Sequence, residues 1–426
     1  MSALAKLFSS YGYTVSGSDR NKSEQTESLA FYGIRVFIGE DGERTSLKDA
    51  DLVVFTDAIP EENAELQTAR RLNKEICSRA DLLQKVSSSF ERVIAVAGSH
   101  GKTTCTSMCA HILQTVGVPY TAHIGGEDLA FGNFYTSGLD YFLTEICEYK
   151  RNLLKIKADV GIVLNVDKDH MECYRDENDL IACFKEYCHN VSVPFVCADD
   201  LNCQRLGELP SFGIINKSAD YRATELKVSE GRYAFTVEEY GKALCRLHLK
   251  AIGRHNVYNA LAAFAVMRAF GFNEKELRKG LESFSAVKRR FERIGEYKKI
   301  TFLCDYAHHP SEIAATVQTA RDVCKGDLYV VFQPHTFSRT KLLMDEFVEV
   351  LRKIPRLMVY KTYPAREAFD RAGSSETLAK NVGNCLYTEN VYALRTWIKT
   401  SAKEGDTVLF LGAGDVYHVA QYLLKE

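Results

Sequence analysis

This chain has few of the features that mark membrane, secreted or disordered proteins. Its 426 residues include only 8 prolines and no low-complexity tract, so we expect a compact, enzyme-like chain without a long disordered segment. No apolar run is long enough to cross a bilayer, and the N-terminus lacks the pattern of a signal peptide. These absences predict a cytoplasmic protein that does not span a membrane.

Neither sign of charge is in excess. The 54 basic and 56 acidic side chains give a net charge of −2, which favours neither nucleic acid nor a membrane as a partner. The 13 cysteines have no disulfide-framework or zinc-ligand spacing, so buried, reduced thiols are expected. The apolar fraction of 46% supports real cores, and the length suggests about three domains.

One motif stands out from this ordinary composition. The apolar run 93–97 stops at Gly98-Ser99-His100-Gly101-Lys102-Thr103-Thr104, and a helical stretch over 107–115 follows. A strand, a glycine loop, Lys-Thr and a helix form a phosphate cradle, in which Lys102 reaches phosphate oxygens and a Thr hydroxyl holds Mg²⁺. Val96 replaces the first Gly of the general G-x-x-x-x-G-K-[ST] pattern. The alternative, an ordinary strand–helix turn, leaves the lysine unexplained.

The rest of the chain alternates β-prone runs with helical stretches, which predicts an α/β protein with parallel sheets. We expect three domains, at 1–85, 86–288 and 289–426, with a linker at 86–89. The expected strands lie at 14–16, 35–38, 52–56, 141–144, 160–164, 301–304, 328–332 and 407–411. Asp19 follows the first of them and suits either a ribose hydroxyl or a simple turn.

Polar side chains follow two strands after the phosphate loop. Glu145 follows the run 141–144, and Asp169-His170 follows the next strand. Ligands collect at the carboxyl ends of parallel strands, so Glu145, His170 and Thr103 are candidate ligands of divalent metal ions. Taken singly, each could be a solvated turn carboxylate or a structural histidine, but their joint placement favours the metal.

Two further segments suit a nucleotide. Asn256 and Asn259 open an apolar helix over 260–270 and could hydrogen-bond a purine edge, although Asn256 could also cap the helix. Arg290 lies at the predicted boundary between the second and third domains, where domain closure could bring it onto a γ-phosphate. The alternative for Arg290 is a solvated surface cation.

Two polar clusters follow successive strands of the third domain. Asp305-Tyr306-Ala307-His308-His309-Pro310 follows the first strand, and the run 333–340, which contains His335 and Arg339, follows the second. Together they predict a second substrate site across a cleft from the phosphate loop. His308-His309 could be a metal pair, but no third ligand is evident in the sequence.

As a set, these motifs resemble the Mur ligase family over essentially the whole chain. The segments that carry the resemblance are 98–104, 169–171, 254–259, 289–292, 305–310 and 332–340. The last favours the branch that joins L-alanine to UDP-N-acetylmuramate over the murein-peptide branch. The resemblance implies an ATP-dependent, Mg²⁺-requiring ligase of peptidoglycan precursor synthesis, serving cell wall biogenesis, cell shape and cell division. It also implies small-molecule substrates only and a monomer or homodimer.

The resemblance also implies the domains and residue roles. It implies a Rossmann-like UDP-substrate domain, a central ATPase-type parallel sheet and a Rossmann-like amino-acid domain. The implied catalytic residues are Lys102, Arg290 and His170, and Thr103 and Glu145 would hold one Mg²⁺ and His170 a second. Gly98 to Thr104, Asn256, Asn259 and Asp305 would bind ATP, and Tyr306, His308, His335 and Arg339 would form the alanine site.

The chain departs from the family pattern at two places. The family's opening strand and glycine-rich loop, which contact the UDP-sugar, would lie ahead of Met1, so we expect a truncated first domain and a start codon placed too far downstream. Upstream DNA with no strand and glycine-rich segment in frame would refute this. After Glu145, Cys147 and Lys150 replace family acids. Alternatives that remain open are another amino-acid or peptide acceptor, or a nucleotide-binding homologue with impaired catalysis.

Overall fold

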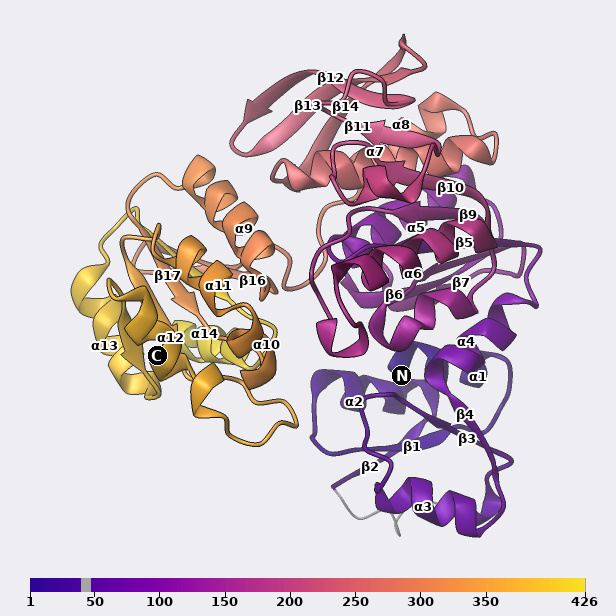
Figure 1. Ribbon diagram of the computed structural model, residues 1–426, viewed down its shortest axis with the longest axis horizontal. Coiled ribbons are helices and arrows are strands. Elements are labelled where there is room, and N and C mark those ends of the chain that lie inside the picture. The colour runs from indigo at the N-terminus through magenta and orange to yellow at the C-terminus, as the bar shows by residue number, and fades with distance from the viewer. Residues whose placement is uncertain (40–46, 426) are drawn as a thin grey trace. The chain divides into compact units, whose positions relative to one another are not determined.

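The computed structural model describes residues 1–39 and 47–425, which divide into two compact units (Figure 1). The first unit comprises Met1–Thr224, Thr236–Cys245 and Tyr258–Ser283. The second comprises Glu225–Phe235, Arg246–Val257 and Phe284–Glu426. Among the helices of these described residues, none is long and apolar enough to cross a membrane.

The first unit opens with two small parallel sheets. Its elements are α1 (Ser2–Ser10), β1 (Ser16–Asp19), α2 (Glu24–Ser28), β2 (Arg35–Ile38), β3 (Leu52–Phe55), α3 (Ala64–Arg71), β4 (Glu75–Ser78) and α4 (Arg79–Ser87). β1 pairs with β2 and β3 pairs with β4, both in parallel, as the alternating pattern predicts. Ser78 caps α4 by accepting a hydrogen bond from the Asp81 N–H at 3.1 Å. The expected linker is shorter than predicted, because α4 continues through Ser87.

A ten-stranded sheet follows in the order β14-β13-β12-β11-β10-β9-β5-β8-β6-β7. Parts of β12, β13 and β14 are grouped with the second unit. In chain order the strands are β5 (Arg92–Ala97), β6 (Tyr120–Asp128), β7 (Gly132–Thr136), β8 (Tyr141–Glu145), β9 (Ala158–Val163), β10 (Val191–Cys197), β11 (Ser211–Gly213), β12 (Tyr221–Ser229), β13 (Arg232–Glu239) and β14 (Lys242–Ile252).

The phosphate-loop strand lies in the interior of this sheet. β5 pairs in parallel with β8 and with β9, so the carboxyl ends of all three strands meet at one edge. Its residues Ile94, Ala95 and Val96 are fully buried, as a strand covered on both faces requires. The helices of this region are α5 (Lys102–Val116), α6 (Glu177–Asn190), α7 (His255–Ala269) and α8 (Glu274–Ser283).

The second unit is built on a six-stranded sheet in the order β15-β16-β20-β17-β18-β19. Its strands are β15 (Glu292–Tyr297), β16 (Ile300–Asp305), β17 (Leu328–Phe332), β18 (Leu357–Tyr360), β19 (Leu386–Thr388) and β20 (Thr407–Leu411). β15 is antiparallel to β16, and the other pairs are parallel. The helices are α9 (Pro310–Val323), α10 (Phe337–Leu342), α11 (Met344–Leu351), α12 (Ser375–Val382), α13 (Val391–Ser401) and α14 (Val416–Lys425).

Alternation along these strands divides their side chains between two apolar clusters. Val330 and Phe332 of β17 pack with residues of α9, α11 and α12, whereas Tyr329 and Val331 pack with residues of α13 and α14. Both faces of the sheet are therefore covered by helices, which is the doubly wound arrangement. This confirms the α/β fold expected from the sequence.

Short 3₁₀ helices connect the larger elements. They are η1 (Leu29–Tyr32), η3 (Leu47–Asp49), η4 (Tyr149–Lys155), η5 (Met171–Cys173), η6 (Cys203–Leu206) and η7 (Arg371–Gly373). Two of them, η4 and η5, follow β8 and β9 in the chain. Glu148 and His170 directly precede these two helices, after the carboxyl ends of the two strands.

Candidate active site

The predicted phosphate loop runs from Gly98 to Gly101, between β5 and α5. Gly101 has φ +83° at the N-terminus of α5, and a Cβ there would lie 2.6 Å from Oδ1 of Asn259. Both the left-handed backbone and the close approach exclude a side chain at this position. The loop therefore presents the N-terminus of a fifteen-residue helix, where backbone N–H groups and the helix dipole favour a phosphate.

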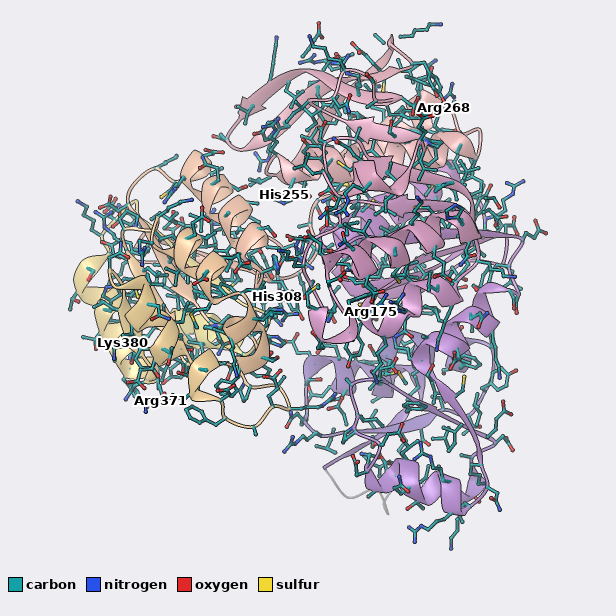
Figure 2. The ribbon with its side chains drawn as sticks, in the orientation of Figure 1. Arg175, His255, Arg268, His308, Arg371 and Lys380 are labelled. Carbon is teal, nitrogen blue, oxygen red and sulfur yellow. The ribbon has the colours of Figure 1, made fainter. Side chains whose placement is uncertain are left out.

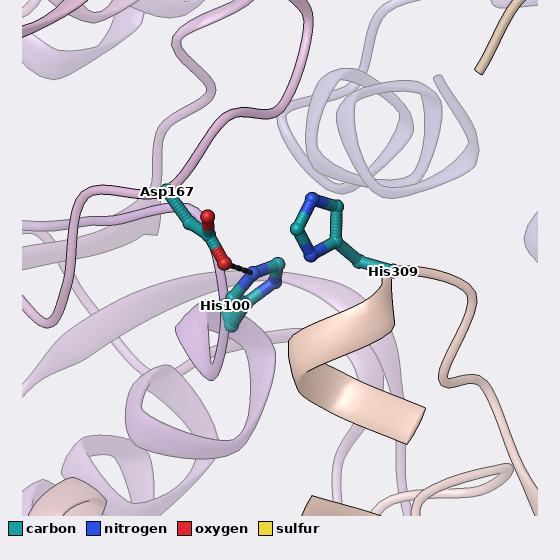
Figure 3. A group of neighbouring side chains, drawn as sticks. All are labelled: His100, Asp167 and His309. Carbon is teal, nitrogen blue, oxygen red and sulfur yellow. Dashed lines mark hydrogen bonds and ion pairs between the residues drawn. The ribbon is translucent and has the colours of Figure 1, made fainter. Parts of the chain in front are cut away.

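Side chains after β9 brace this loop. The backbone N–H of His100 donates to Oδ1 of Asn165 at 2.8 Å, and the N–H of Asp167 donates to the Ser99 hydroxyl at 2.8 Å. Figure 3 shows the imidazole of His100 paired with the Asp167 carboxylate, at 3.1 Å between Nε2 and Oδ2. Ser99 and His100 thus hold the loop in shape through contacts made inside the first unit.

Lys102 is paired with a buried carboxylate that the motif does not contain. Its Nζ lies 3.2 Å from Oε2 of Glu148 and 3.1 Å from the carbonyl oxygen of Ser99, and it also donates to the Gly98 carbonyl. Burial by itself lowers the pKa of Lys102, but the surrounding anions, led by Glu148, outweigh it and raise the pKa. Lys102 is therefore a permanent cation at the loop.

Thr103 and Glu145 lie together, as expected of two ligands of one metal ion. The Thr103 hydroxyl donates to Oε2 of Glu145 at 2.7 Å. Oε1 of Glu145 occupies the space beside Gly125, where an added Cβ would lie 1.4 Å from it. A hydroxyl and a carboxylate next to a phosphate loop are the oxygen donors that Mg²⁺ prefers.

Gly125→Ala is expected to weaken metal binding more than it destabilises the fold. The new Cβ meets only the far end of the flexible Glu145 side chain, so the carboxylate moves and the backbone need not. We expect the Mg²⁺ concentration for half-maximal turnover to rise about tenfold or more, with a loss of unfolding free energy below about 1 kcal/mol. Magnesium titrations and denaturant unfolding measure the two effects. An unchanged magnesium dependence would contradict the metal role of Glu145.

A second group of possible metal ligands lies beside Lys102. One ligand atom each from Glu148, Asp169 and His170 lies within 4.8 Å of the others. Oε1 of Glu148 is buried and finds no hydrogen-bond partner among the described residues, and a bound cation would supply one. The residues therefore fit the second metal position expected at His170, and they add two carboxylates to it.

His170 also contacts the thiol of Cys147. Its Nε2 lies 3.8 Å from Sγ of Cys147, and its Nδ1 lies 3.4 Å from Oε1 of Glu172. Burial lowers the pKa of His170, but Cys147, Glu172 and Asp169 outweigh it and raise the pKa to about 11. A metal ion that binds this imidazole must therefore displace a proton. Lys150 extends to Asp57, with 3.6 Å between Nζ and Oδ1.

The two asparagines expected at the purine have different surroundings. Asn259 lies against the phosphate loop at Gly101. Asn256 is buried in the second unit and donates from Nδ2 to the Ile252 carbonyl at 2.8 Å. The alternative that Asn256 caps its helix is wrong, because α7 already begins at His255.

In the second unit, Asp305 organises the start of the expected amino-acid site. Its carboxylate accepts hydrogen bonds from the N–H groups of Phe291 and Ala307, at 2.7 and 2.8 Å. Burial raises the pKa of Asp305, while Arg290 opposes that rise. The guanidinium of Arg290 lies 5.1 Å from the ring centre of Tyr306 and 3.8 Å from Oε1 of Glu312.

The remaining four predicted residues also lie in the second unit, and the structure brings them into contact. His308, two residues before α9 (Figure 2), lies with its ring centre 5.4 Å from that of Tyr306 and 5.8 Å from that of His335. Nη1 of Arg339 lies 3.2 Å from Nδ1 of His335. Loops after two non-adjacent strands, β16 and β17, thus build one polar cluster with a guanidinium suited to a carboxylate.

Comparison with known proteins accounts for this combination of sites. Residues 1–91 match the model described as "Mur ligase family, catalytic domain". Residues 96–267 match the "Mur ligase middle domain", and residues 289–414 match the "Mur ligase, glutamate ligase domain". This chain belongs to the Mur ligase family. The Mur ligase resemblance expected from the motifs is thereby confirmed.

The Mur ligase relatives match along the whole chain. UDP-N-acetylmuramate--L-alanine ligase of Acetivibrio thermocellus is 36% identical over 440 residues, covering 100% of this chain and 93% of the relative. The Clostridium novyi protein of the same name is 37% identical over 438 residues, covering 100% and 95%. The crystal structure of UDP-N-acetylmuramate-alanine ligase from Thermotoga maritima superposes with a TM-score of 0.85 at 28% identity, covering 100% and 96%.

Three residues of this Mur ligase site escaped the sequence motifs. Glu148 pairs with Lys102, Glu312 pairs with His308 at 3.3 Å, and the ring of Tyr363 stacks on His335 at 5.6 Å between centres. Glu312 follows His308 by four residues at the start of a helix, a spacing that sequence reasoning could have used. Nothing local marks Glu148 as buried or Tyr363 as a neighbour of His335.

His335 is expected to make this Mur ligase less stable in acid. Burial, His308 and Arg339 lower the pKa of His335 from 6.5 to about 3. Between pH 6.5 and pH 3, His335 is protonated in the unfolded chain but neutral in the folded chain. The folded state therefore loses stability as the pH falls from 6.5 towards 3. Urea unfolding at pH 7 and pH 5 should show a smaller loss in His335→Gln than in the parent. An equal loss in both proteins would contradict a neutral His335.

Proposed function

We propose that this Mur ligase joins L-alanine to UDP-N-acetylmuramate and converts ATP to ADP and phosphate in the same reaction. The observation that carries the proposal is the phosphate loop, where Lys102 pairs with Glu148 and Thr103 with Glu145, in a chain that matches relatives of that name over its full length. A phosphate loop with a metal-ligand pair supports phosphoryl transfer, and the relatives' name supplies the two molecules to be joined.

The first step is transfer of the γ-phosphoryl group to the acceptor. A carboxylate oxygen of UDP-N-acetylmuramate attacks the γ-phosphorus, the bond to ADP breaks, and an acyl phosphate forms. Lys102 and Arg290 neutralise charge on the transferring group, and the N–H groups from Gly98 to Thr104 hold the remaining phosphates. Thr103 and Glu145 would hold one Mg²⁺ and His170 a second, and these ions would supply positive charge at the phosphate oxygens.

The second step forms the amide. The free amine of L-alanine attacks the acyl carbon, and the tetrahedral intermediate expels phosphate. Arg339 is suited to the alanine carboxylate, with Tyr306, His308 and His335 around it. Asn256 and Asn259 are assigned to adenine and Asp305 to the ribose side of the nucleotide. A cytoplasmic location and a monomeric or dimeric state stay predictions.

Release of ADP, measured with a panel of amino acids and one peptide, tests the proposal. The protein is assayed with ATP, Mg²⁺ and UDP-N-acetylmuramate. L-alanine, L-serine, glycine or a tripeptide that begins with L-alanine is added in separate reactions. Turnover that depends on L-alanine and yields the amide product supports the proposed function. Selectivity for the tripeptide would favour a ligase with a peptide acceptor, and ATP binding without turnover would favour an impaired homologue.

A further inference from the structure

A cavity of about 140 Å³ in the first unit contains one unexplained cation. It lies at the carboxyl end of β8, where Glu145 and Cys147 line it together with Thr56, Asp57, Arg79 and Asn152. Among the twelve described residues that line it, Arg79 is the only cationic side chain. None of the motifs from which the active site was predicted includes Arg79.

Arg79 occupies a position that disfavours a cation. It is the first residue of α4, where the positive end of the helix dipole opposes a guanidinium. Of the two carboxylates that line the cavity, Glu145 accepts a hydrogen bond from the Thr103 hydroxyl, and Asp57 is also paired. Asp57 accepts a hydrogen bond from Nδ2 of Asn152 at 3.0 Å and lies 3.6 Å from Nζ of Lys150. An anionic ligand would relieve the unfavourable position of Arg79.

Buried side chains hold the guanidinium in this position. Nη2 of Arg79 lies 3.3 Å from Nε2 of His123, and Nδ1 of His123 lies 3.0 Å from the Thr144 hydroxyl, which donates to the Glu145 carbonyl at 3.0 Å. Arginine can only donate, so Nε2 of His123 accepts and Nδ1 carries the proton. His123 is 3% exposed and Thr144 is fully buried, so a chain of hydrogen bonds ties Arg79 to the backbone of Glu145.

We propose that Arg79 binds the carboxylate of UDP-N-acetylmuramate and that His123 is the positioning residue that orients the Arg79 guanidinium. The inference rests on the proposed function, because it places the reacting carboxylate in the cavity that Glu145 also lines. A guanidinium recognises a carboxylate through its planar set of N–H donors. Within the described part of the chain, the guanidinium hydrogen-bonds only to His123, so a carboxylate can approach its other N–H groups while the Arg79–His123–Thr144 hydrogen bonds stay intact.

Two sugar nucleotides, one with the carboxylate and one without it, test whether Arg79 recognises the carboxylate itself. A general effect of Arg79 on nucleotide binding would change both dissociation constants equally. UDP-N-acetylmuramate carries the carboxylate, and UDP-N-acetylglucosamine lacks it. Dissociation constants of both are measured by calorimetry for the parent protein and for Arg79→Gln and Arg79→Lys. ATP binding and thermal unfolding of each variant report on the integrity of the fold. Arg175→Gln is the matched control, since Arg175 is a surface cation paired with Asp179 (Figure 2).

The parent should prefer the carboxylated nucleotide, and Arg79→Gln should reduce that preference about 10- to 100-fold. Arg79→Lys should restore only part of it, because an ammonium cannot pair in a bidentate manner. His123→Gln, which keeps an acceptor for Arg79, should retain more of the preference than His123→Leu. Arg175→Gln should match the parent.

Two results would overturn the inference in different ways. If Arg79→Gln keeps the parent's preference, or weakens both nucleotides equally, Arg79 does not bind the carboxylate, and the proposed ligase activity still stands. If the parent itself shows no preference for UDP-N-acetylmuramate, the proposed acceptor is wrong and the role of Arg79 is wrong with it.

Discussion

Lys102→Ala is expected to reduce turnover about 1,000-fold, because the variant lacks the cation that neutralises the transferring phosphoryl group. The same substitution leaves the Glu148 carboxylate buried without its cationic partner, since this side chain is only 1% exposed. We therefore expect a loss of unfolding free energy of about 3 kcal/mol. ADP release measures the first effect and denaturant unfolding the second.

A double variant separates these two consequences of removing Lys102. Lys102→Ala combined with Glu148→Gln removes the unpaired buried charge and should recover part of the stability without recovering turnover. Near-normal turnover in the single variant would refute the role of Lys102. Recovery of turnover in the double variant would show that the defect came from the stranded carboxylate and not from the missing cation.

Arg339→Ala is expected to raise the KM for L-alanine about 100-fold through loss of a charged hydrogen-bonding partner for the amino-acid carboxylate. The KM for ATP should stay near the parent value, because Lys102, Thr103 and Glu145 are intact. Arg339→Lys should recover only part of the loss, since the ammonium lacks the planar fork. Initial rates with each substrate varied in turn give the two constants.

Lys341→Ala provides the matched control for Arg339. Lys341 lies on the same helix, α10, but its ammonium pairs with Asp370 at 3.1 Å and is mostly exposed. Its removal should leave both constants unchanged. If Arg339→Ala altered the KM for ATP as much as that for L-alanine, the assignment of Arg339 to the amino acid would be wrong.

Local patterns in the sequence predicted much of this fold. The strands expected at 328–332 and 407–411 are observed at those residues. Both strands are covered by helices on both faces, so their sequences are continuous apolar runs, and each strand ends where its apolar run ends. The strand expected at 14–16 instead runs from Ser16 to Asp19. Pairing with β2 decides its limits, and that pairing joins residues far apart in the chain.

The candidate site also has one part that local sequence predicted and another that it did not. The loop from Gly98 to Thr104 could be predicted, because its glycines, lysine and threonines are consecutive and each performs a local task. Glu148 follows Glu145 by three residues, yet nothing in that spacing shows that it is buried against Lys102. The partnership depends on how η4 folds after β8, where Lys150 and Arg151 adopt positive φ.

The sequence by itself determined the nucleotide loop, the α/β class, the family and the residues at the carboxyl ends of the strands. These follow from hydrophobic periodicity and from motifs in which neighbouring residues act together. Only the tertiary structure decided that Glu148 pairs with Lys102, that Gly125 makes room for Glu145 and that His123 contacts Arg79. Each of these contacts depends on how segments pack after folding, and burial and partner choice are properties of that packing rather than of local sequence.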